Sequence, residues 1–395
     1  MSPDYLPPLF WLLVPIAAAS GWYAARWRTP VPRGKATHQD LSSYFKGLNY
    51  LLNEQPDKAI EVFVKSLEVE SETVETHLAL GNLFRRQGEV DRAICLHQNL
   101  IAQISLTREQ RCHALLELGM DYMRSGLLDR AESLFQELLR QGITLYTRQA
   151  LKQLLDIYQL EQDWDKAVAC ARELESRCGE EVCHLIAQFH CEQAEQSIWQ
   201  GDSEQALNWV RKALSIDPHC VRASLMEGIL AMEAGQIKQA IRAYKRIEHQ
   251  DSEFLGETMR PLMECYKALG RLDEFSDYVR SVSMNYPGIT PALLLAELIA
   301  NQQGIDQAVS YLSQELQRRP SIRGLDRLLE YAVTHLNGLS KQQVDVLKRF
   351  TSNLLKGKFT YKCRHCGFMG KTLHWQCPSC KYWNSVRPIH GIEGV

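Results

Sequence analysis

The feature that most constrains the fold is an internal repeat with a period of 34 residues, which is clearest between Gly47 and Gly81. An alanine stands twelve residues after each glycine of this pattern, and in most units an aromatic ring stands sixteen residues after it. In the unit that begins at Gly119 these residues are Ala131 and Phe135. A period of this length predicts a stack of short helical hairpins, because a single hairpin cannot bury its own apolar face.

The offsets resemble those of the tetratricopeptide repeat. Weaker units fill the gaps between the clear ones, and together they predict about eight repeats between residues 41 and 320. The small residues at the first and the +12 positions let the paired helices approach closely, and the ring at +16 fills the space towards the neighbouring unit. Residues 321–355 continue a helical pattern, and we expect them to cap the array.

Repeats of this kind present a groove that is lined mainly by the first helix of each unit, and such a groove suits a partner peptide. By that resemblance, the polar side chains expected to face the groove are Asn82, Arg85, Lys152, Asp156, Gln159, Arg260, Glu264 and Lys267.

Four cysteines near the end of the chain predict a metal site. Cys363 and Cys366 form one C-x-x-C pair, and Cys377 and Cys380 form a second pair after ten intervening residues. Two such turns that face each other place four thiolates in a tetrahedron, which zinc and a single iron ion prefer. The pattern resembles rubredoxin and the zinc ribbons, and it predicts bound zinc or, alternatively, iron. We expect the ribbon to lock the C-terminal end of the repeats.

The ribbon region, residues 356–395, is basic and rich in aromatic residues, and these features leave alternatives open. It holds seven Lys or Arg residues and one acidic residue. Its aromatic residues predict either packing and docking of the ribbon or RNA binding. We expect His365 and His374 to lie outside the metal shell, since four cysteines complete it. A redox carrier is a further alternative that the basic surface disfavours. The aromatic residues in question are Tyr361, Phe368, Trp375, Tyr382 and Trp383.

The first residues predict a membrane anchor. Leu6–Ala25 carries no charge, and a helix of that length spans about 30 Å. Positive charges follow this run and do not precede it, which argues against a cleaved signal peptide and places the rest of the chain in the cytoplasm. Residues 1–28 are therefore the expected anchor, and residues 29–40 are the expected linker.

The composition excludes few functional classes, but it agrees with a scaffold protein. The formal net charge is -2, and the chain contains none of the common phosphate-binding, zinc-protease or serine-hydrolase motifs. The eight cysteines outside the ribbon are expected to be small apolar residues of helices. We therefore predict no catalytic residues, no organic cofactor and no enzyme activity.

The order of these segments resembles the lipopolysaccharide assembly protein B family of Gram-negative bacteria over essentially the full length. The segments that carry the resemblance are the apolar run with GWY, the repeat HLALGNLFRRQGEVDRAICLHQNL and the ribbon CRHCGF with LHWQCPSC. The resemblance implies a single-pass inner-membrane protein with a cytoplasmic body and metal ligands at Cys363, Cys366, Cys377 and Cys380.

The resemblance also implies partners. They are a membrane-bound AAA metalloprotease, the deacetylase that commits precursors to lipid A and that would be its client, and other inner-membrane proteins of the lipopolysaccharide pathway. A homodimer is an open alternative. The expected fold is an all-α tetratricopeptide-repeat solenoid with an N-terminal transmembrane helix and a C-terminal rubredoxin-like ribbon, residues 356–395. The expected role is that of an adaptor, and an RNA-binding scaffold is the alternative.

Overall fold

The computed structural model describes residues 74–102, 106–284, 286–335 and 339–391, together with isolated positions before residue 74. The chain divides into two compact units, Met1–Ala150 and Leu151–Val395. The predicted anchor and linker lie outside the described residues, apart from the isolated positions 19, 20 and 23. Within the described part of the chain, no helix combines the length and the apolar character needed to cross a bilayer.

The first unit consists of antiparallel helix pairs. Its described elements are α4 (Val74–Gln87), α5 (Val90–Ile101), α6 (Arg108–Ser125), α7 (Leu128–Gln141) and the first half of α8 (Thr144–Glu161). A capping box at Thr107 starts α6, because the threonine side chain accepts from the backbone N–H of Gln110 while the Gln110 side chain accepts from the backbone N–H of Thr107.

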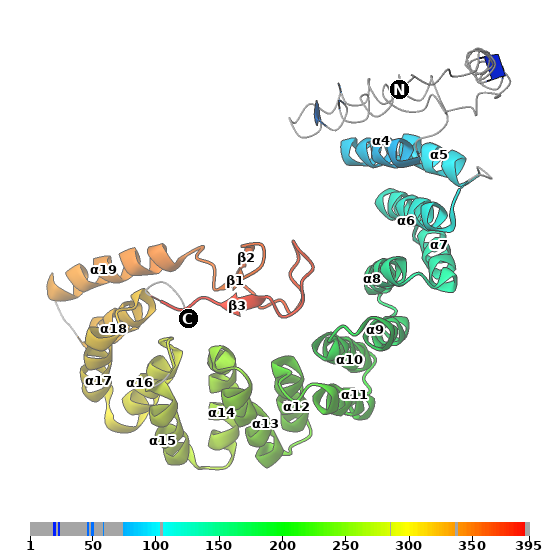
Figure 1. The fold of residues 1–395 in the computed structure, drawn as a ribbon. Helices are drawn as coiled ribbons and strands as arrows, with labels where there is room; N and C mark the ends of the chain where they lie inside the picture. Colours follow the sequence, from blue (N-terminus) through cyan, green and yellow to red (C-terminus); the bar gives the residue numbers. More distant parts are fainter. Residues whose placement is uncertain are drawn as a thin grey trace, which may run out of the picture. The chain divides into compact units, whose positions relative to one another are not determined.

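The second unit continues the helix pairs and ends in a small sheet (Figure 1). Its helices are α9 (Trp164–Cys178), α10 (Cys183–Trp199), α11 (Ser203–Ile216), α12 (Val221–Glu233), α13 (Ile237–Gln250), the 3-10 turn η1 (Ser252–Phe254), α14 (Leu255–Ala268), α15 (Leu272–Ser283), α16 (Thr290–Gln303), α17 (Ile305–Arg318), α18 (Ile322–His335) and α19 (Leu339–Leu355). The last two helices occupy the stretch that we expected to cap the repeats.

Close approach between paired helices explains the glycines of the repeat. A Cβ atom on Gly119 would lie 2.4 Å from the ring of Phe135, and one on Gly228 would lie 2.3 Å from the ring of Tyr244. Each ring stands sixteen residues after its glycine, as the period predicts. Among the described residues, six alanines at +12 are fully buried; they are Ala93, Ala131, Ala167, Ala206, Ala240 and Ala308. The helical solenoid with a C-terminal ribbon is therefore confirmed.

One unit replaces the ring at +16 with a buried polar cluster. His97 lies against Gly81, and its Nδ1 atom is 2.5 Å from a carboxylate oxygen of Asp121. Arg85 forms ion pairs with Asp121 at 2.8 Å and with Glu117 at 2.5 Å. We expected Arg85 to be available in the groove, but its side chain is only 17% exposed and is committed to these carboxylates.

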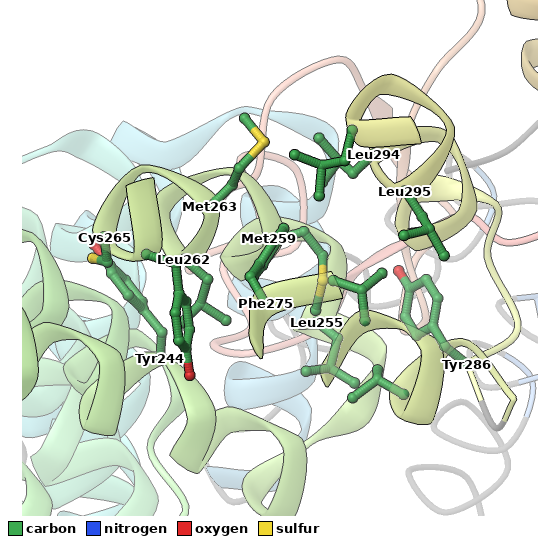
Figure 2. Close-up of a cluster of buried hydrophobic side chains, with 14 of the residues drawn as sticks. Tyr244, Leu255, Met259, Leu262, Met263, Cys265, Phe275, Tyr286, Leu294 and Leu295 are labelled. Atoms are coloured by element: carbon green, nitrogen blue, oxygen red, sulfur yellow. The ribbon is translucent and has the colours of Figure 1, made fainter. Parts of the chain in front are cut away.

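The largest core of the second unit runs through several consecutive hairpins. Figure 2 shows Tyr244 of α13, Met259 and Leu262 of α14, Phe275 of α15 and Leu295 of α16 packed in one cluster. The cluster therefore joins neighbouring repeats, as stacking of units that cannot fold alone requires.

The ribbon forms a three-stranded antiparallel sheet with the order β2-β1-β3. Its strands are β1 (Tyr361–Cys363), β2 (Met369–Gly370) and β3 (Val386–Pro388). In this sheet Tyr361 is paired with Gly370 on one side and with Pro388 on the other. The sheet is too small to bury a large core, so the ribbon depends on its metal site and on docking.

Candidate metal centre and its docking surface

The four cysteines of the ribbon come together with the geometry of a metal site. Their sulfur atoms all lie within 4.8 Å of one another. The sulfurs of Cys363 and Cys380 are 3.7 Å apart, and those of Cys366 and Cys377 are 3.6 Å apart. A tetrahedral ion about 2.3 Å from each sulfur would separate them by about 3.8 Å, so zinc or iron fits between them.

Two tight turns position the sulfurs. In the first turn, the backbone N–H groups of His365 and Cys366 point at the sulfur of Cys363, at 3.4 and 3.5 Å. The second turn closes with the backbone N–H of Lys381 donating to the carbonyl of Cys377 at 2.9 Å. Lys381 has a φ of 59°, the left-handed conformation that Gly367 adopts in the first turn with a φ of 79°.

The thiols differ in how readily they ionise. Burial opposes ionisation of Cys363, but hydrogen bonds with Ser385 and with backbone N–H groups outweigh burial and lower the pKa of this thiol to about 6. Burial and contacts with the other three thiols raise the pKa of Cys380 to about 12. The cluster therefore needs a cation to hold four thiolates at neutral pH, and metal binding would release protons.

The nearby histidines have other partners. His365 stacks on Tyr382 with ring centroids 4.0 Å apart. His374 is hydrogen-bonded through Nε2 to the hydroxyl of Thr372 at 3.1 Å. Neither histidine belongs to the group of possible metal ligands found among the described residues. Four protein sulfurs complete a tetrahedral shell, which is typical of structural sites and leaves no open coordination position.

Trp383 docks the ribbon onto the helices. Its indole N–H donates to the side-chain oxygen of Gln159 at 2.7 Å, and Gln376 donates to the same oxygen at 3.3 Å. The Trp383 ring lies edge-on to Trp164 and Phe189, with centroids 6.4 and 6.0 Å away. Trp383 is half-buried, and an aromatic ring whose one polar atom is satisfied is a usual anchor of an interface.

A second contact lies around η1. The ring of Trp375 stacks on Phe254 with centroids 5.4 Å apart. Arg387 forms an ion pair with Asp251, and its guanidinium lies 4.9 Å from the centroid of the Phe254 ring.

Two polar contacts flank this stacked pair. The hydroxyl of Tyr361 donates to Glu257 at 2.5 Å, and Arg364 forms an ion pair with Glu253. Docking is thus both apolar and charge-complementary, because basic residues of the ribbon meet acidic residues of the repeats.

These contacts bear on three sequence-based expectations. We expected the ribbon to lock the C-terminal end of the array, but its contacts begin much further back, at Gln159 of α8. They extend to Tyr286 after α15, where the His390 ring lies edge-on to the tyrosine with centroids 5.3 Å apart. The expected groove residue Gln159 is occupied by the ribbon itself. Arg364 and Arg387, which contributed to the RNA-binding alternative, are both paired with acidic residues of the chain.

The sequence did not point to the surface that receives the ribbon. This surface includes Trp164, Phe189, Phe254 and the buried Arg222, whose guanidinium lies 5.9 Å from the centroid of the Trp383 ring. Arg222 is 3% exposed and forms ion pairs with Glu192 and Glu195.

Comparisons with known proteins agree with the geometry. The rubredoxin metal binding domain matches residues 361–388, and the tetratricopeptide repeat matches residues 76–111. Lipopolysaccharide assembly protein B of Escherichia coli strain K12 is 38% identical over 391 residues, covering 98% of this chain and 99% of that protein.

A second relative supports the same assignment. The protein of the same name from Haemophilus influenzae strain Rd is 35% identical over 395 residues, with 98% and 99% coverage. The chain belongs to the lipopolysaccharide assembly protein B family. Among solved structures, Naa15/Naa10 bound to HypK-THB has a TM-score of 0.40 and 13% identity, covering 80% of this chain and 47% of that one. The family assignment therefore rests on the full-length relatives, and the ribbon match lies on the four-cysteine site.

Proposed function

We propose that this protein is a non-enzymatic adaptor at the cytoplasmic face of the inner membrane. It regulates lipopolysaccharide synthesis by promoting degradation of the deacetylase that commits precursors to lipid A. The membrane-bound AAA metalloprotease carries out that degradation. The observation that carries the proposal is the similarity to lipopolysaccharide assembly protein B over 98% of this chain.

The architecture supports an adaptor more than an enzyme. Helical repeats supply extended binding surfaces, and a metal bound by four thiolates has a structural role. The ribbon contacts the repeats from Gln159 of α8 to Tyr286 after α15 and so leaves the repeats from α16 onwards for a client. In the second unit, the first helix of each pair lies on the inner side of the curve that also holds the ribbon (Figure 1).

A polar hollow beside the ribbon offers a binding place for that client. It has a volume of about 420 Å³ and is lined by Arg260 of α14, Glu297 and Asn301 of α16, and Arg327 and Tyr331 of α18. The guanidinium groups of both arginines lie near Glu297, at 3.9 and 4.0 Å, which are long ion pairs. We assign an acidic segment of the client to this hollow, because guanidinium groups bind carboxylates.

The decisive experiment measures the amount and half-life of the deacetylase in cells depleted of this protein, with and without the membrane protease. The proposal requires the deacetylase to accumulate on depletion and to rise no further when the protease is also absent. An unchanged half-life would refute the adaptor role. Deleting residues 1–28 tests the anchor, and the expected product is a folded protein that no longer regulates.

The hollow can be tested in the same assay. Arg260→Glu combined with Arg327→Glu should lengthen the half-life of the deacetylase, since it reverses the charge offered to the client. Arg280→Glu is the matched control, because Arg280 is an exposed residue of α15 whose ion-pair partner is Asp277. Equal behaviour of the two variants would remove the hollow from the proposal while leaving the adaptor role open to the depletion test.

A further inference from the structure

The helix that ends the repeats carries an apolar stripe on its exposed side. In α19, the side chains of Val346, Leu347, Phe350 and Leu354 are 64%, 54%, 61% and 41% exposed. At 3.6 residues per turn these four positions fall within an arc of roughly 100°. We call these four residues the α19 stripe. The end of a helical-repeat array is normally polar on its outer side, so an apolar stripe there indicates a partner.

The opposite side of α19 fixes the helix to the protein. Asp326 of α18 accepts hydrogen bonds from Lys348 at 2.6 Å, Thr351 at 2.7 Å and Ser352 at 2.8 Å. These three residues lie on the side of α19 away from the stripe. Packing of α19 against α18 therefore holds the helix in a fixed rotation and turns the stripe outward.

The net charge around α19 indicates the chemistry of the partner that the stripe binds. Residues 339–359 contain five basic residues and one acidic residue, Asp345, which gives this segment a net charge of +4 in a chain whose total is -2. Arg349 is 77% exposed although it pairs with Asp345, and Lys341 and Lys356 are exposed. A second copy that joined stripe to stripe would bring the same positive charge, so the charge favours an anionic partner.

We propose that α19 binds an anionic membrane surface. An amphipathic helix with Phe and Leu on one side and Lys and Arg on the polar side lies in the headgroup region of a bilayer, with its apolar side inserted. Basic side chains beside it are attracted to anionic lipids, and their long stems can reach the headgroups. The α19 stripe would enter the bilayer, while Arg349 and Lys356 would remain at its surface.

This inference rests on α19 and does not depend on the protease or the deacetylase. If the predicted anchor also holds the chain at the membrane, it raises the effective concentration of lipid around α19, so weak contact suffices. The same surface would then fix the orientation of the repeats relative to the bilayer.

The test uses the full chain reconstituted into vesicles of phosphatidylethanolamine with phosphatidylglycerol. Phe350→p-benzoyl-phenylalanine places a photoreactive group in the stripe, and mass spectrometry of the irradiated protein identifies what it contacts. The expected result is lipid adducts at position 350 that fall at high salt and in vesicles of neutral phosphatidylcholine. Met284→p-benzoyl-phenylalanine is the matched control, because Met284 is 79% exposed outside α19.

Each other outcome overturns the inference. Cross-links from position 350 to a second copy would make the stripe a dimer interface, and the absence of adducts would leave it without a lipid contact. The additional variant Leu347→Glu should abolish the lipid adducts while metal content and thermal unfolding stay unchanged, since this side chain is exposed. The half-life of the deacetylase is measured separately, so failure of this inference and failure of the adaptor role are distinguishable.

Discussion

At the scale of the residue, Gly119 and Phe135 illustrate how this repeat specifies its helix spacing. The ring of Phe135 is fully buried and occupies the space that any side chain on Gly119 would need. The conflict is with the rigid edge of an aromatic ring and not with a flexible chain end, so the ring or the helix must move to accept even a methyl group.

Gly119→Ala should therefore destabilise the first unit by about 1–3 kcal/mol, although alanine favours helices. Urea unfolding monitored by circular dichroism measures this loss. Gly142→Asn is the control, because Gly142 has a φ of 71° with open space around it, and asparagine tolerates that conformation. Adding Phe135→Leu to Gly119→Ala should recover part of the loss. Full stability of Gly119→Ala would contradict the close approach.

Glu117 makes the stability of the first unit depend on pH. Burial would raise its pKa, but hydrogen bonds with His113 and Arg85 and their charges outweigh burial and lower the pKa from 4.5 to about 2. A carboxyl whose pKa is lower in the folded state stabilises the fold above its unfolded pKa. That contribution, about 3 kcal/mol at most, is lost as the pH falls from 4.5 towards 2.

Glu117→Gln should accordingly lower the free energy of unfolding at pH 7 and have little effect at the acidic end of that window. Unfolding in urea at several pH values compares the variant with the natural protein. Glu109→Gln, at an exposed position of the same helix, should show no such pH-dependent difference. A deficit of equal size at every pH would mean that Glu117 acts through packing and not through its charge.

At the scale of the element, the helix pairs and the metal turns were predictable because each is a local pattern. The glycine and the aromatic ring sixteen residues later meet within one hairpin, and the cysteine spacing closes within each turn. The docking surface was not predictable in this way. It joins Trp383 to Gln159 and Trp375 to Phe254, across more than a hundred residues, and it depends on how successive repeats stack.

The buried cluster around His97 is a second feature that the repeat pattern did not predict. The repeat pattern predicts an apolar ring at the +16 position. The histidine at this position also supplies a ring, but its imidazole is paired with a carboxylate. That partner, Asp121, lies in the next helix pair, so the sequence pattern gave no sign that Arg85 would be drawn into the same cluster. The first helix of a unit therefore does not always leave its polar residues to the groove.

Trp383→Ala should release the ribbon from the helices without removing its metal. The substitution removes the hydrogen bond to Gln159 and the ring contacts with Trp164 and Phe189, a loss of about 2–4 kcal/mol for a central aromatic residue. Hydrogen exchange of ribbon amides should accelerate, while zinc content measured by mass spectrometry stays at the natural level. Tyr382→Ala is the control, because Tyr382 is 58% exposed and stacks only within the ribbon, on His365.

Loss of metal in the Trp383→Ala variant would contradict this separation of docking from coordination.

The reverse experiment removes the metal and leaves the docking residues in place. Cys363→Ser with Cys366→Ser should abolish metal binding and leave the ribbon sensitive to proteolysis, since a structural zinc contributes on the order of 10 kcal/mol to a fold this small. The helices α9–α17 should retain most of their circular dichroism, because their largest core contains no ribbon residue.

At the scale of the whole molecule, the ribbon lies where it can connect metal binding to client binding. It contacts Glu257 of α14, and Arg260 of the polar hollow lies one helical turn further along the same helix. A docked ribbon therefore defines one wall of the region that we propose for the client. In this arrangement the metal matters to function because it keeps the ribbon folded and thus able to dock.

That reasoning predicts that undocking and metal loss have the same cellular effect. Trp375→Ala with Trp383→Ala should stabilise the deacetylase in cells as strongly as Cys363→Ser with Cys366→Ser does, although only the cysteine variant loses its metal. The half-life of the deacetylase and the metal content of each purified variant measure the two quantities independently. The undocked variant could instead promote normal turnover while the cysteine variant does not. In that case the folded ribbon would act by binding a partner directly, and its docking on the helices would not be the reason that function needs the metal.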